Sequence, residues 1–347
     1  MKQGPIGTAV IGCGRISRSH LAAVATQPEL ARLVAVVDTD PKLAERAAAA
    51  YGAAHAFGEV DSALARDDVQ AVVICLPNDL HAPVAIKAAA AGKHVLVEKP
   101  MANSAAGAAE MARQAEESGI VLAIGQCRRY FRAMEYLVSR RGEFGELISV
   151  QLSLGVKWHE AQAPWWREPG KAGGLVIGLN GPHALDFVQM VMGAEDPLRV
   201  HAEAVRRQGF WEGEDEAMIL LAYPSRRLAS VHLSFNQDPV EDRKVLVFER
   251  GTAVLESDRN LSFNGALLVV RGEDETRHYL DEAVEFRRQF HEFVKAICGE
   301  PSRAVLAPEG LRLMRLLDAV RRAYRDGVAV ELAPMGAARE TRAKHLV

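Results

Sequence analysis

The stretch Val10–His20 reads VIGCGRISRSH, and it places two glycines between an apolar run and a helical pattern. Gly12 permits a tight turn after a strand, and Gly14 lets the backbone approach a pyrophosphate that rests on the helix N-terminus. The third small position of this fingerprint holds Ser17, which still allows close packing of the helix on the strand. The stretch therefore predicts the first strand–turn–helix unit of a dinucleotide-binding domain.

The first third of the chain repeats this alternation of apolar runs with Ala-rich segments of helical period. The runs are TAVIG (8–12), LVAVVD (33–38), AVVICLP (71–77), HVLVEK (94–99) and IVLAIG (120–125). Nearly continuous apolarity with many β-branched residues is typical of parallel strands buried on both faces. We therefore expect an α/β fold that begins with a doubly wound parallel sheet, a Rossmann domain, over residues 1–127.

The pattern changes after about Arg141. ELISVQLSLGV, RVHAEAVRR, EAMILLAYP, RLASVHLSF and RKVLVFERG alternate apolar with polar residues and are joined mostly without helices. This alternation predicts a mainly antiparallel sheet with one solvated or ligand-facing side in a second domain, residues 128–335, and two amphipathic helices close the chain. The polar tail 336–347 is expected to be loose or to act as an oligomer arm.

Composition limits the function classes. The net charge is −3 with both signs interspersed, which argues against a nucleic-acid surface. The four cysteines lie far apart without metal-ligand spacing, so we expect no metal and a reducing, cytoplasmic setting. No apolar stretch approaches the ~20 residues of a membrane helix, and the N-terminus lacks a cleavable signal pattern, so we expect no membrane partner.

Asp38 ends the second apolar run, 24 positions beyond Gly14. A carboxylate there accepts hydrogen bonds from ribose hydroxyls and repels a 2′-phosphate, which favours NAD over NADP. The alternative is a turn or helix-capping role for Asp38. Arg15 is a nearby cation that could accommodate a phosphate.

Lys99 follows the strand HVLVE and precedes Pro100. Ligands bind outside the carboxyl ends of parallel strands, so this lysine is a candidate for stabilising a developing alkoxide beside a nicotinamide. The alternative is an ordinary exposed lysine at a strand end.

GCGRISRSH, LPNDLHAPVAIKAAAAGKHVLVEKP and GGLVIGLNGPHALD together resemble the glucose–fructose oxidoreductase / inositol dehydrogenase / MocA family over nearly the whole chain. The resemblance implies an N-terminal Rossmann domain and a C-terminal α/β domain built on a large, mainly antiparallel open sheet, with the last helices packing back towards the Rossmann domain. It implies pyridine-nucleotide-dependent oxidation or reduction of a carbinol on a sugar, cyclitol or related polyol. It also implies a homodimer or homotetramer formed through the face of the C-terminal sheet.

The resemblance assigns roles to individual residues. Those on the cofactor are Gly12, Gly14, Arg15 and Ile16 at the phosphates, Asp38 at the adenosine ribose, Pro77, Asn78, His81 and Glu98 at the nicotinamide side, and Trp166 and Arg167 near it. Lys99 matches the catalytic lysine, and His183 matches the catalytic histidine of an Asp-x-x-x-His pattern.

The chain departs from that pattern at Leu179, where relatives carry the aspartate. Leucine can neither bind a hydroxyl nor move a proton, so Lys99 and His183 remain as candidates, with His183 favoured as acid/base and Lys99 as alkoxide stabiliser. Asn180 could bind a substrate hydroxyl. Pro182 either kinks a helix or lies in the first turn of one that begins near Asn180.

Other side chains near this segment have two interpretations each. His183 could be a structural histidine at a helix terminus, and Asp186 is expected to face a structural neighbour. Trp158, Trp165 and Trp166 suit the C–H faces of a sugar or packing against another surface. Arg128 and Arg129 would bind a substrate group or pair with carboxylates such as Glu135 or Glu143.

Three functions follow. The first is an NAD-dependent dehydrogenase acting on a sugar, cyclitol or polyol. The second is a redox-neutral enzyme that keeps NAD bound and uses transient oxidation for elimination or glycosidic cleavage. The third is a nucleotide-binding sensor with little catalysis, which only the leucine at position 179 supports.

Overall fold

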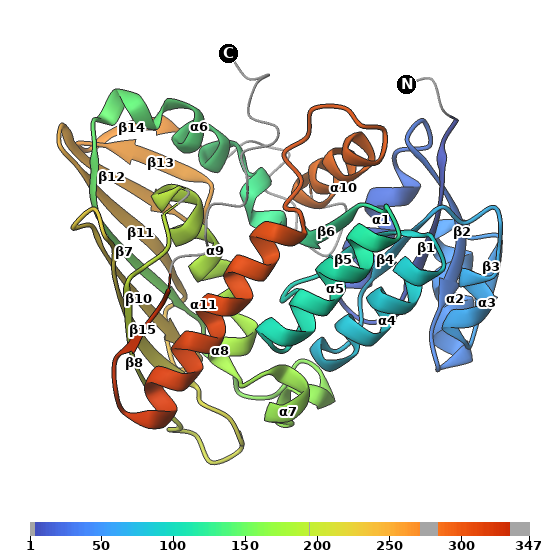
Figure 1. Ribbon diagram of the computed structural model, residues 1–347, viewed down its shortest axis with the longest axis horizontal. Helices are drawn as coiled ribbons and strands as arrows, with labels where there is room; N and C mark the ends of the chain where they lie inside the picture. The colour runs from blue at the N-terminus through green and yellow to red at the C-terminus, as the bar shows by residue number, and fades with distance from the viewer. Residues whose placement is uncertain (1–3, 194, 271–283, 334–347) are drawn as a thin grey trace.

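The computed structural model describes residues 4–193, 195–270 and 284–333. Two sheets lie side by side with helices between and around them, and the helix α11 (Ala307–Asp326) runs from one to the other (Figure 1). The predicted tail 336–347 lies outside the described residues.

The N-terminal sheet has six parallel strands among the described residues, in the order β3-β2-β1-β4-β5-β6. Its strands are β1 (Ile6–Ile11), β2 (Ala31–Val37), β3 (His55–Phe57), β4 (Ala71–Ile74), β5 (His94–Glu98) and β6 (Leu122–Gly125). The connecting helices are α1 (Ser17–Ala25), α2 (Pro41–Tyr51), α3 (Val60–Leu64), α4 (Asn78–Ala90) and α5 (Ala105–Glu117). The order reverses between β1 and β4, where such folds bind ligands, and the predicted Rossmann sheet is confirmed.

Local signals explain where these elements begin and end. Asp40 caps α2 by accepting the Lys42 N–H at 2.9 Å, Pro41 is the first helical residue, and Gly52 ends the helix in the left-handed conformation at φ 76°. The three-residue strand β3 was not predicted, because so short a segment carries no periodicity.

The C-terminal sheet has nine described strands in the order β14-β13-β12-β11-β7-β10-β9-β8-β15. They are β7 (Leu147–Gly155), β8 (Arg199–Val205), β9 (Glu216–Ala222), β10 (Leu228–Ser234), β11 (Glu241–Phe248), β12 (Gly251–Glu256), β13 (Asn260–Phe263), β14 (Ala266–Val269) and β15 (Val330–Glu331). Neighbours pair antiparallel except β7 and β10, which are parallel. The mainly antiparallel open sheet is confirmed.

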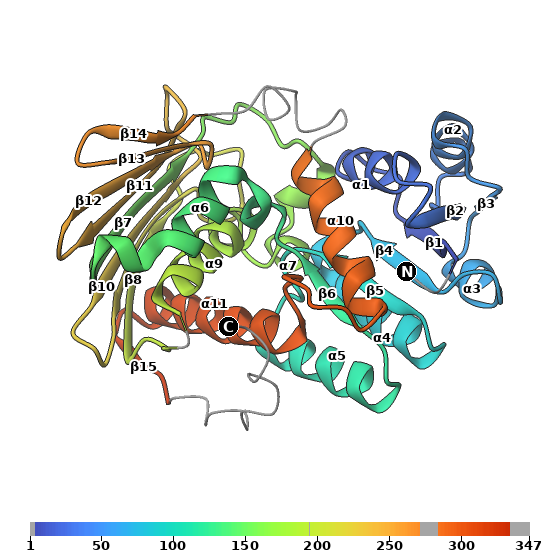
Figure 2. The same cartoon turned by 90° about the horizontal axis from the view of Figure 1, so that it is seen from above.

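Helices cover one face of this sheet and leave the other bare (Figure 2). They include α6 (Arg132–Arg140), α9 (Gly181–Met192) and α11. Strand β9 shows the consequence, because Ala217, Ile219 and Leu221 are buried on the covered face while Met218 and Leu220 are exposed on the bare face.

The remaining described elements are short connections and one further helix. They are η1 (Cys127–Tyr130), η2 (Arg141–Phe144), η3 (Pro164–Arg167), α7 (Pro169–Ala172), α8 (Val176–Leu179) and α10 (Val284–Ile297). Helix α10 packs on α1, where the Phe286 ring meets the His20 ring edge-on at 4.9 Å. None of the helices in the described part of the chain is both long and apolar enough to cross a membrane.

Candidate active site

The glycine loop lies at the carboxyl edge of the parallel sheet. Gly12 has φ 91°, and a Cβ atom on it would lie 2.5 Å from the Cys75 carbonyl oxygen, so only glycine fits this turn. A Cβ on Gly14 would meet no atom within 4 Å, which leaves open space above the loop. Arg15 is exposed, and the half-buried Ile16 precedes helix α1. This cradle fits the phosphates of a dinucleotide.

Asp38 lies beside this loop. One carboxylate oxygen accepts the Cys13 N–H at 2.8 Å, and the other accepts the Asp40 N–H at 2.9 Å. The carboxylate therefore shapes the turn, as the structural alternative required, and each oxygen retains a lone pair that a ribose hydroxyl could use. Its negative charge stands where a 2′-phosphate would be repelled.

Glu98, the last residue of β5, is buried and holds the next residue in place. Its carboxylate binds His20 Nε2 at 2.7 Å and accepts the Lys99 N–H at 3.0 Å. Burial opposes its charge, but the hydrogen bond and charge of His20 hold the pKa of Glu98 below its usual value. His20 was not singled out in the sequence, although it closes the glycine-loop stretch.

Lys99 reaches across to the second domain, where its Nζ donates to the Leu179 carbonyl oxygen at 3.0 Å. Burial lowers the pKa of the Lys99 ammonium, while the charge of Glu98 opposes that shift. The lysine is therefore anchored beside the position of the missing aspartate, by the main chain of the residue that replaces it.

His183 lies in the first turn of α9, for which Asn180 is the N-cap residue and Pro182 falls within the first two helical positions. The helix thus starts where the second interpretation of Pro182 predicted. The His183 Nδ1 atom is buried and has no hydrogen-bond partner within the described residues. Burial and the charges of Lys99, Arg128 and Lys244 hold the pKa of His183 well below its usual value, so the ring is neutral near pH 7.

Asp186 binds Arg129 through two hydrogen bonds of 2.7 and 2.6 Å, which confirms that it faces a structural neighbour. The alternative that the two arginines pair with carboxylates is confirmed, but the two glutamates named as examples are not their partners. Glu135 pairs with Arg303 and Glu143 with Arg140, because these glutamates lie on the outer helices α6 and η2.

Arg128 instead joins a buried charge cluster built from Arg128, Asp242, Lys244 and Asp258. Asp242 and Asp258 each bind both Arg128 and Lys244, and the Lys244–Asp258 ion pair measures 2.5 Å. Burial opposes the charge of Asp242, but Arg128 and Lys244 hold its pKa below the usual value. Strand β11 brings the cluster up to α9, where Lys244 Nζ lies 5.8 Å from the centre of the Phe187 ring.

The predicted nicotinamide-side residues lie around the loop after β4. Asn78 is buried and donates to the Ala172 carbonyl oxygen at 2.9 Å. The buried His81 ring lies 2.7 Å from the Pro100 carbonyl oxygen and 2.9 Å from that of Leu76, which precedes the half-buried Pro77. These contacts tie the loop after β5 and the second domain to α4.

The tryptophans of the long loop pack mainly on one another. Trp166 is buried and stacks on Phe235 with a centroid distance of 6.2 Å, and Trp158 and Trp165 meet it edge-on. Packing is therefore the observed role of Trp166. Trp165 stays half-buried and Arg167 is exposed. In the described part of the chain no group of three metal-ligating side chains is found.

The fold and the residues at the carboxyl edge of the parallel sheet together define a class of protein, the two-domain pyridine-nucleotide oxidoreductases. The family model for the oxidoreductase family with an NAD-binding Rossmann fold matches residues 6–126, and that for the GFO/IDH/MocA C-terminal domain matches residues 131–254. The chain belongs to the Gfo/Idh/MocA family of oxidoreductases.

Full-length relatives agree with this assignment. The chain is 30% identical to D-xylose 1-dehydrogenase (NADP(+)) 2 of Haloferax volcanii over 346 residues, covering 96% of this chain and 100% of that one. It is 27% identical to inositol 2-dehydrogenase of Rhizobium meliloti over 338 residues, covering 93% and 98%. The solved structure of GenD2 from gentamicin A biosynthesis in complex with NAD aligns with a TM-score of 0.82 at 25% identity, covering 96% and 98%.

Proposed function

We propose that this protein is an NAD-dependent dehydrogenase that oxidises or forms a carbinol on a sugar, cyclitol or related polyol. The observation that carries the proposal is the anchored Lys99, which lies at the carboxyl edge of the Rossmann sheet and bonds Leu179 one turn before His183. The names of the xylose and inositol dehydrogenases support the substrate class. Asp38 supports NAD as the preferred cofactor, although the xylose relative is named for NADP(+).

The residues divide the chemistry between them. When bound, the nicotinamide accepts or returns the hydride of the carbinol carbon. Neutral His183 takes the hydroxyl proton in the oxidative direction and returns it in the other. The Lys99 ammonium stabilises the negative charge that develops on the same oxygen. Asn180 and Trp165 are assigned to hydroxyls and C–H faces of the substrate. Arg128, whose side chain remains 23% exposed beside its ion pairs with Asp242 and Asp258, is assigned to a polar substituent.

A panel of inositols, aldoses and ketoses tests the proposal. Purified protein with NAD should produce NADH, followed by absorbance, with at least one of them. Binding of NADH without turnover across the whole panel would contradict a dehydrogenase function.

The redox-neutral alternative keeps one supporting observation, which is the aliphatic side chain at position 179. Such an enzyme would form product without net NADH and would exchange the proton next to the oxidised carbon with solvent deuterium. Net NADH formation without that exchange would exclude it.

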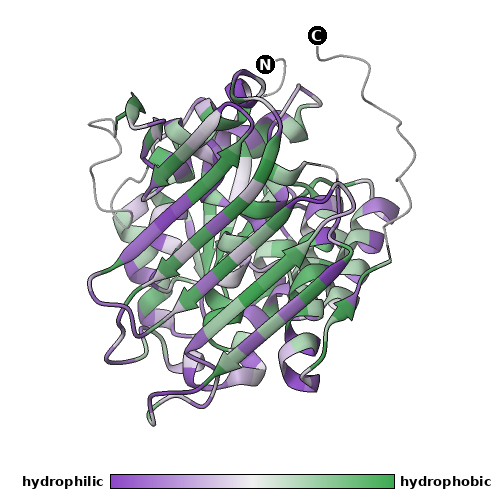
Figure 3. Cartoon of the chain, turned by 90° about the vertical axis from the view of Figure 1, so that its left-hand side faces the viewer, coloured by the Kyte–Doolittle hydropathy of each residue, from purple (hydrophilic) through white to green (hydrophobic). Residues whose placement is uncertain are grey.

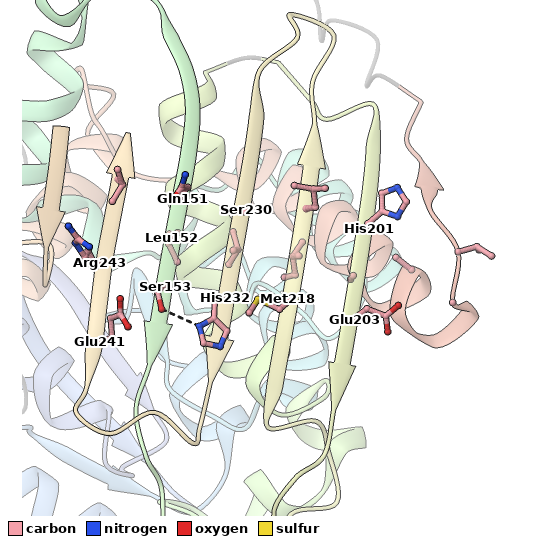
Figure 4. A pocket seen from close by; sticks show the side chains of 18 residues that line it. Gln151, Leu152, Ser153, His201, Glu203, Met218, Ser230, His232, Glu241 and Arg243 are labelled. Atoms are coloured by element: carbon pink, nitrogen blue, oxygen red, sulfur yellow. Dashed lines mark hydrogen bonds between the residues drawn. The ribbon is translucent and has the colours of Figure 1, made fainter. Parts of the chain in front are cut away.

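The bare face of the C-terminal sheet supports self-association as a homodimer or homotetramer. Green and purple residues alternate over it in Figure 3, and Met218 and Leu220 are 58% and 47% exposed. A hollow of about 550 Å³ lies on this face, where Ser153 Oγ and His232 Nδ1 are 3.3 Å apart (Figure 4). Exposed apolar side chains in such an array are typical of an interface.

Light scattering on Leu220→Lys tests that surface, and the molar mass of the variant in solution should be lower than that of the wild type.

The four cysteines are unpaired, which supports a cytoplasmic setting. We also propose a division at 127/128, because the two family matches end at 126 and begin at 131.

A further inference from the structure

Glu214 is a buried residue just before β9 that plays no part in the chemistry proposed above. Its Oε1 accepts the Leu175 N–H at 2.8 Å and the Ile177 N–H at 3.1 Å. Its main-chain carbonyl accepts the Val176 N–H at 2.9 Å. One residue therefore binds three consecutive amides of a segment that lies 37 to 39 positions earlier in the chain.

Those amides begin the single turn α8, and the end of the turn is in the candidate active site. The Leu179 N–H bonds to the Leu175 carbonyl, and the Leu179 carbonyl receives Lys99 Nζ. The next residue, Asn180, accepts the His183 N–H at 3.1 Å. Hydrogen bonds and the main chain of α8 thus connect Glu214 to the Lys99 ammonium and to the His183 main chain.

Two glycines let Glu214 approach this closely. A Cβ atom on Gly174, which has φ 97°, would lie 2.6 Å from Glu214 Oε1. One on Gly213 would lie 2.8 Å from the Leu175 Cβ atom. Side chains at either position would push Glu214 away from α8, so the contact depends on the glycine just before Leu175 as well as on the carboxylate.

Burying the Glu214 carboxylate costs free energy, which its hydrogen bonds and a nearby positive charge offset. Burial raises the pKa of Glu214, and the amides of Leu175 and Ile177 and the charge of Arg321 oppose that shift. Arg321 and Tyr324 approach it from α11. An apolar residue at this position would avoid the free-energy cost of burying a carboxylate. The feature that a glutamate supplies here is therefore the acceptor oxygen.

We propose that Glu214 is a positioning residue for the active site: it fixes the turn α8 so that the Leu179 carbonyl holds Lys99 and Asn180 holds His183. Its effect on turnover rests on the proposed dehydrogenase function, whereas its effect on α8 and Lys99 does not. Because Lys99 is anchored by a main-chain carbonyl, the placement of the lysine depends on what fixes that main chain.

The test compares Glu214→Ala with Glu214→Gln, which keeps an acceptor oxygen in the same place, and with Glu212→Ala, an exposed neighbour. Two measurements need no substrate. One is hydrogen–deuterium exchange of peptides covering 174–184 against those covering α1. The other is acetylation of Lys99, quantified by mass spectrometry relative to the exposed Lys42.

Glu214→Ala should exchange faster at 174–184 with α1 unchanged, and its Lys99 should be acetylated faster relative to Lys42. With a substrate in hand, its kcat should fall by about 10²-fold, the scale of a small misplacement of a reacting group, while NADH binding stays the same. Glu214→Gln should recover most of each property, and Glu212→Ala should match the wild type.

Unchanged exchange at 174–184, or unchanged Lys99 acetylation, would overturn the inference whether or not any polyol is a substrate. Faster exchange throughout the protein in both Glu214 variants would also overturn it, because that marks a general loss of stability. A wild-type enzyme inactive on all polyols counts against the proposed function alone.

Discussion

The two sides of the candidate active site are built in different ways. The side proposed to bind the cofactor is formed by the glycine loop, Asp38 and the end of β5. Each of these lies at or directly after the carboxyl end of a strand of one parallel sheet. The substrate side gathers Arg128, His183, Lys244 and Asp258 from segments far apart in the chain. The cofactor side therefore depends on local turns, whereas the substrate side depends on how the strands of the C-terminal sheet are ordered.

The substitution with the largest expected effect removes the hydrogen bond between Lys99 and the Leu179 carbonyl, which joins the two sides. Lys99→Met removes the ammonium that bonds Leu179 and should lower kcat by about 10³-fold while the fold and NADH binding persist. Steady-state turnover and NADH fluorescence measure this, with Lys42→Met as the exposed control. Retained turnover would mean that a group other than Lys99 stabilises the developing alkoxide.

A second change tests the substrate side alone. Lys244→Met should lower the free energy of unfolding by about 3–5 kcal/mol, because Asp242 and Asp258 would keep buried charge with one partner fewer. Urea unfolding measures the loss. Lys42→Met is the control, since the Lys42 side chain is exposed on α2. Equal stability of the two variants would show that the cluster is well hydrated.

The cofactor side is tested by Asp38→Asn, which keeps the shape of the side chain and removes its charge. The ratio of kcat/KM for NAD to that for NADP should fall by about 10-fold or more, because repulsion of the 2′-phosphate is lost. Exposed Asp67→Asn serves as control. An unchanged ratio would mean that Arg15 or another group decides between the cofactors.

The smallest expected effect concerns pH. The pKa of His183 is lowered in the folded protein, so below about pH 6.5 the unfolded chain binds the proton first and folding becomes less favourable. From pH 7.5 to 5.5 the wild type should lose about 1 kcal/mol more unfolding free energy than His183→Gln. Urea unfolding at both pH values measures this, with His291→Gln, at an exposed position on α10, as control. Equal losses of unfolding free energy in the wild type and His183→Gln would mean that the His183 ring binds a proton as readily in the native protein as in the unfolded chain.

The sequence placed the glycine loop, Asp38 and Lys99 at the carboxyl edge of the parallel sheet, because each follows a recognisable strand, and their roles towards the cofactor stay predictions. It also predicted strands β7 to β11, in which the alternation is regular. The short strands β12, β13 and β14 were not predicted, since each has only four to six residues.

The charge cluster was missed for a different reason. Lys244 shares the buried register of Leu246 and Phe248 on β11, and a lysine in such a register is a signal that a partner must be buried with it. The partners Arg128 and Asp258 could not be named, because they lie in η1 and in the turn between β12 and β13, outside any strand pattern. The incorrect pairing of the arginines with Glu135 and Glu143 came from judging by sequence distance.

The contact between Lys99 and the Leu179 carbonyl has a consequence for substitutions at position 179. Every amino acid offers the same carbonyl, so the lysine is held without regard to which side chain stands at position 179. The same is true of Asn78, which holds the Ala172 carbonyl. A library at position 179 could therefore change the side chain next to the Lys99 contact while these main-chain contacts between the two domains persist.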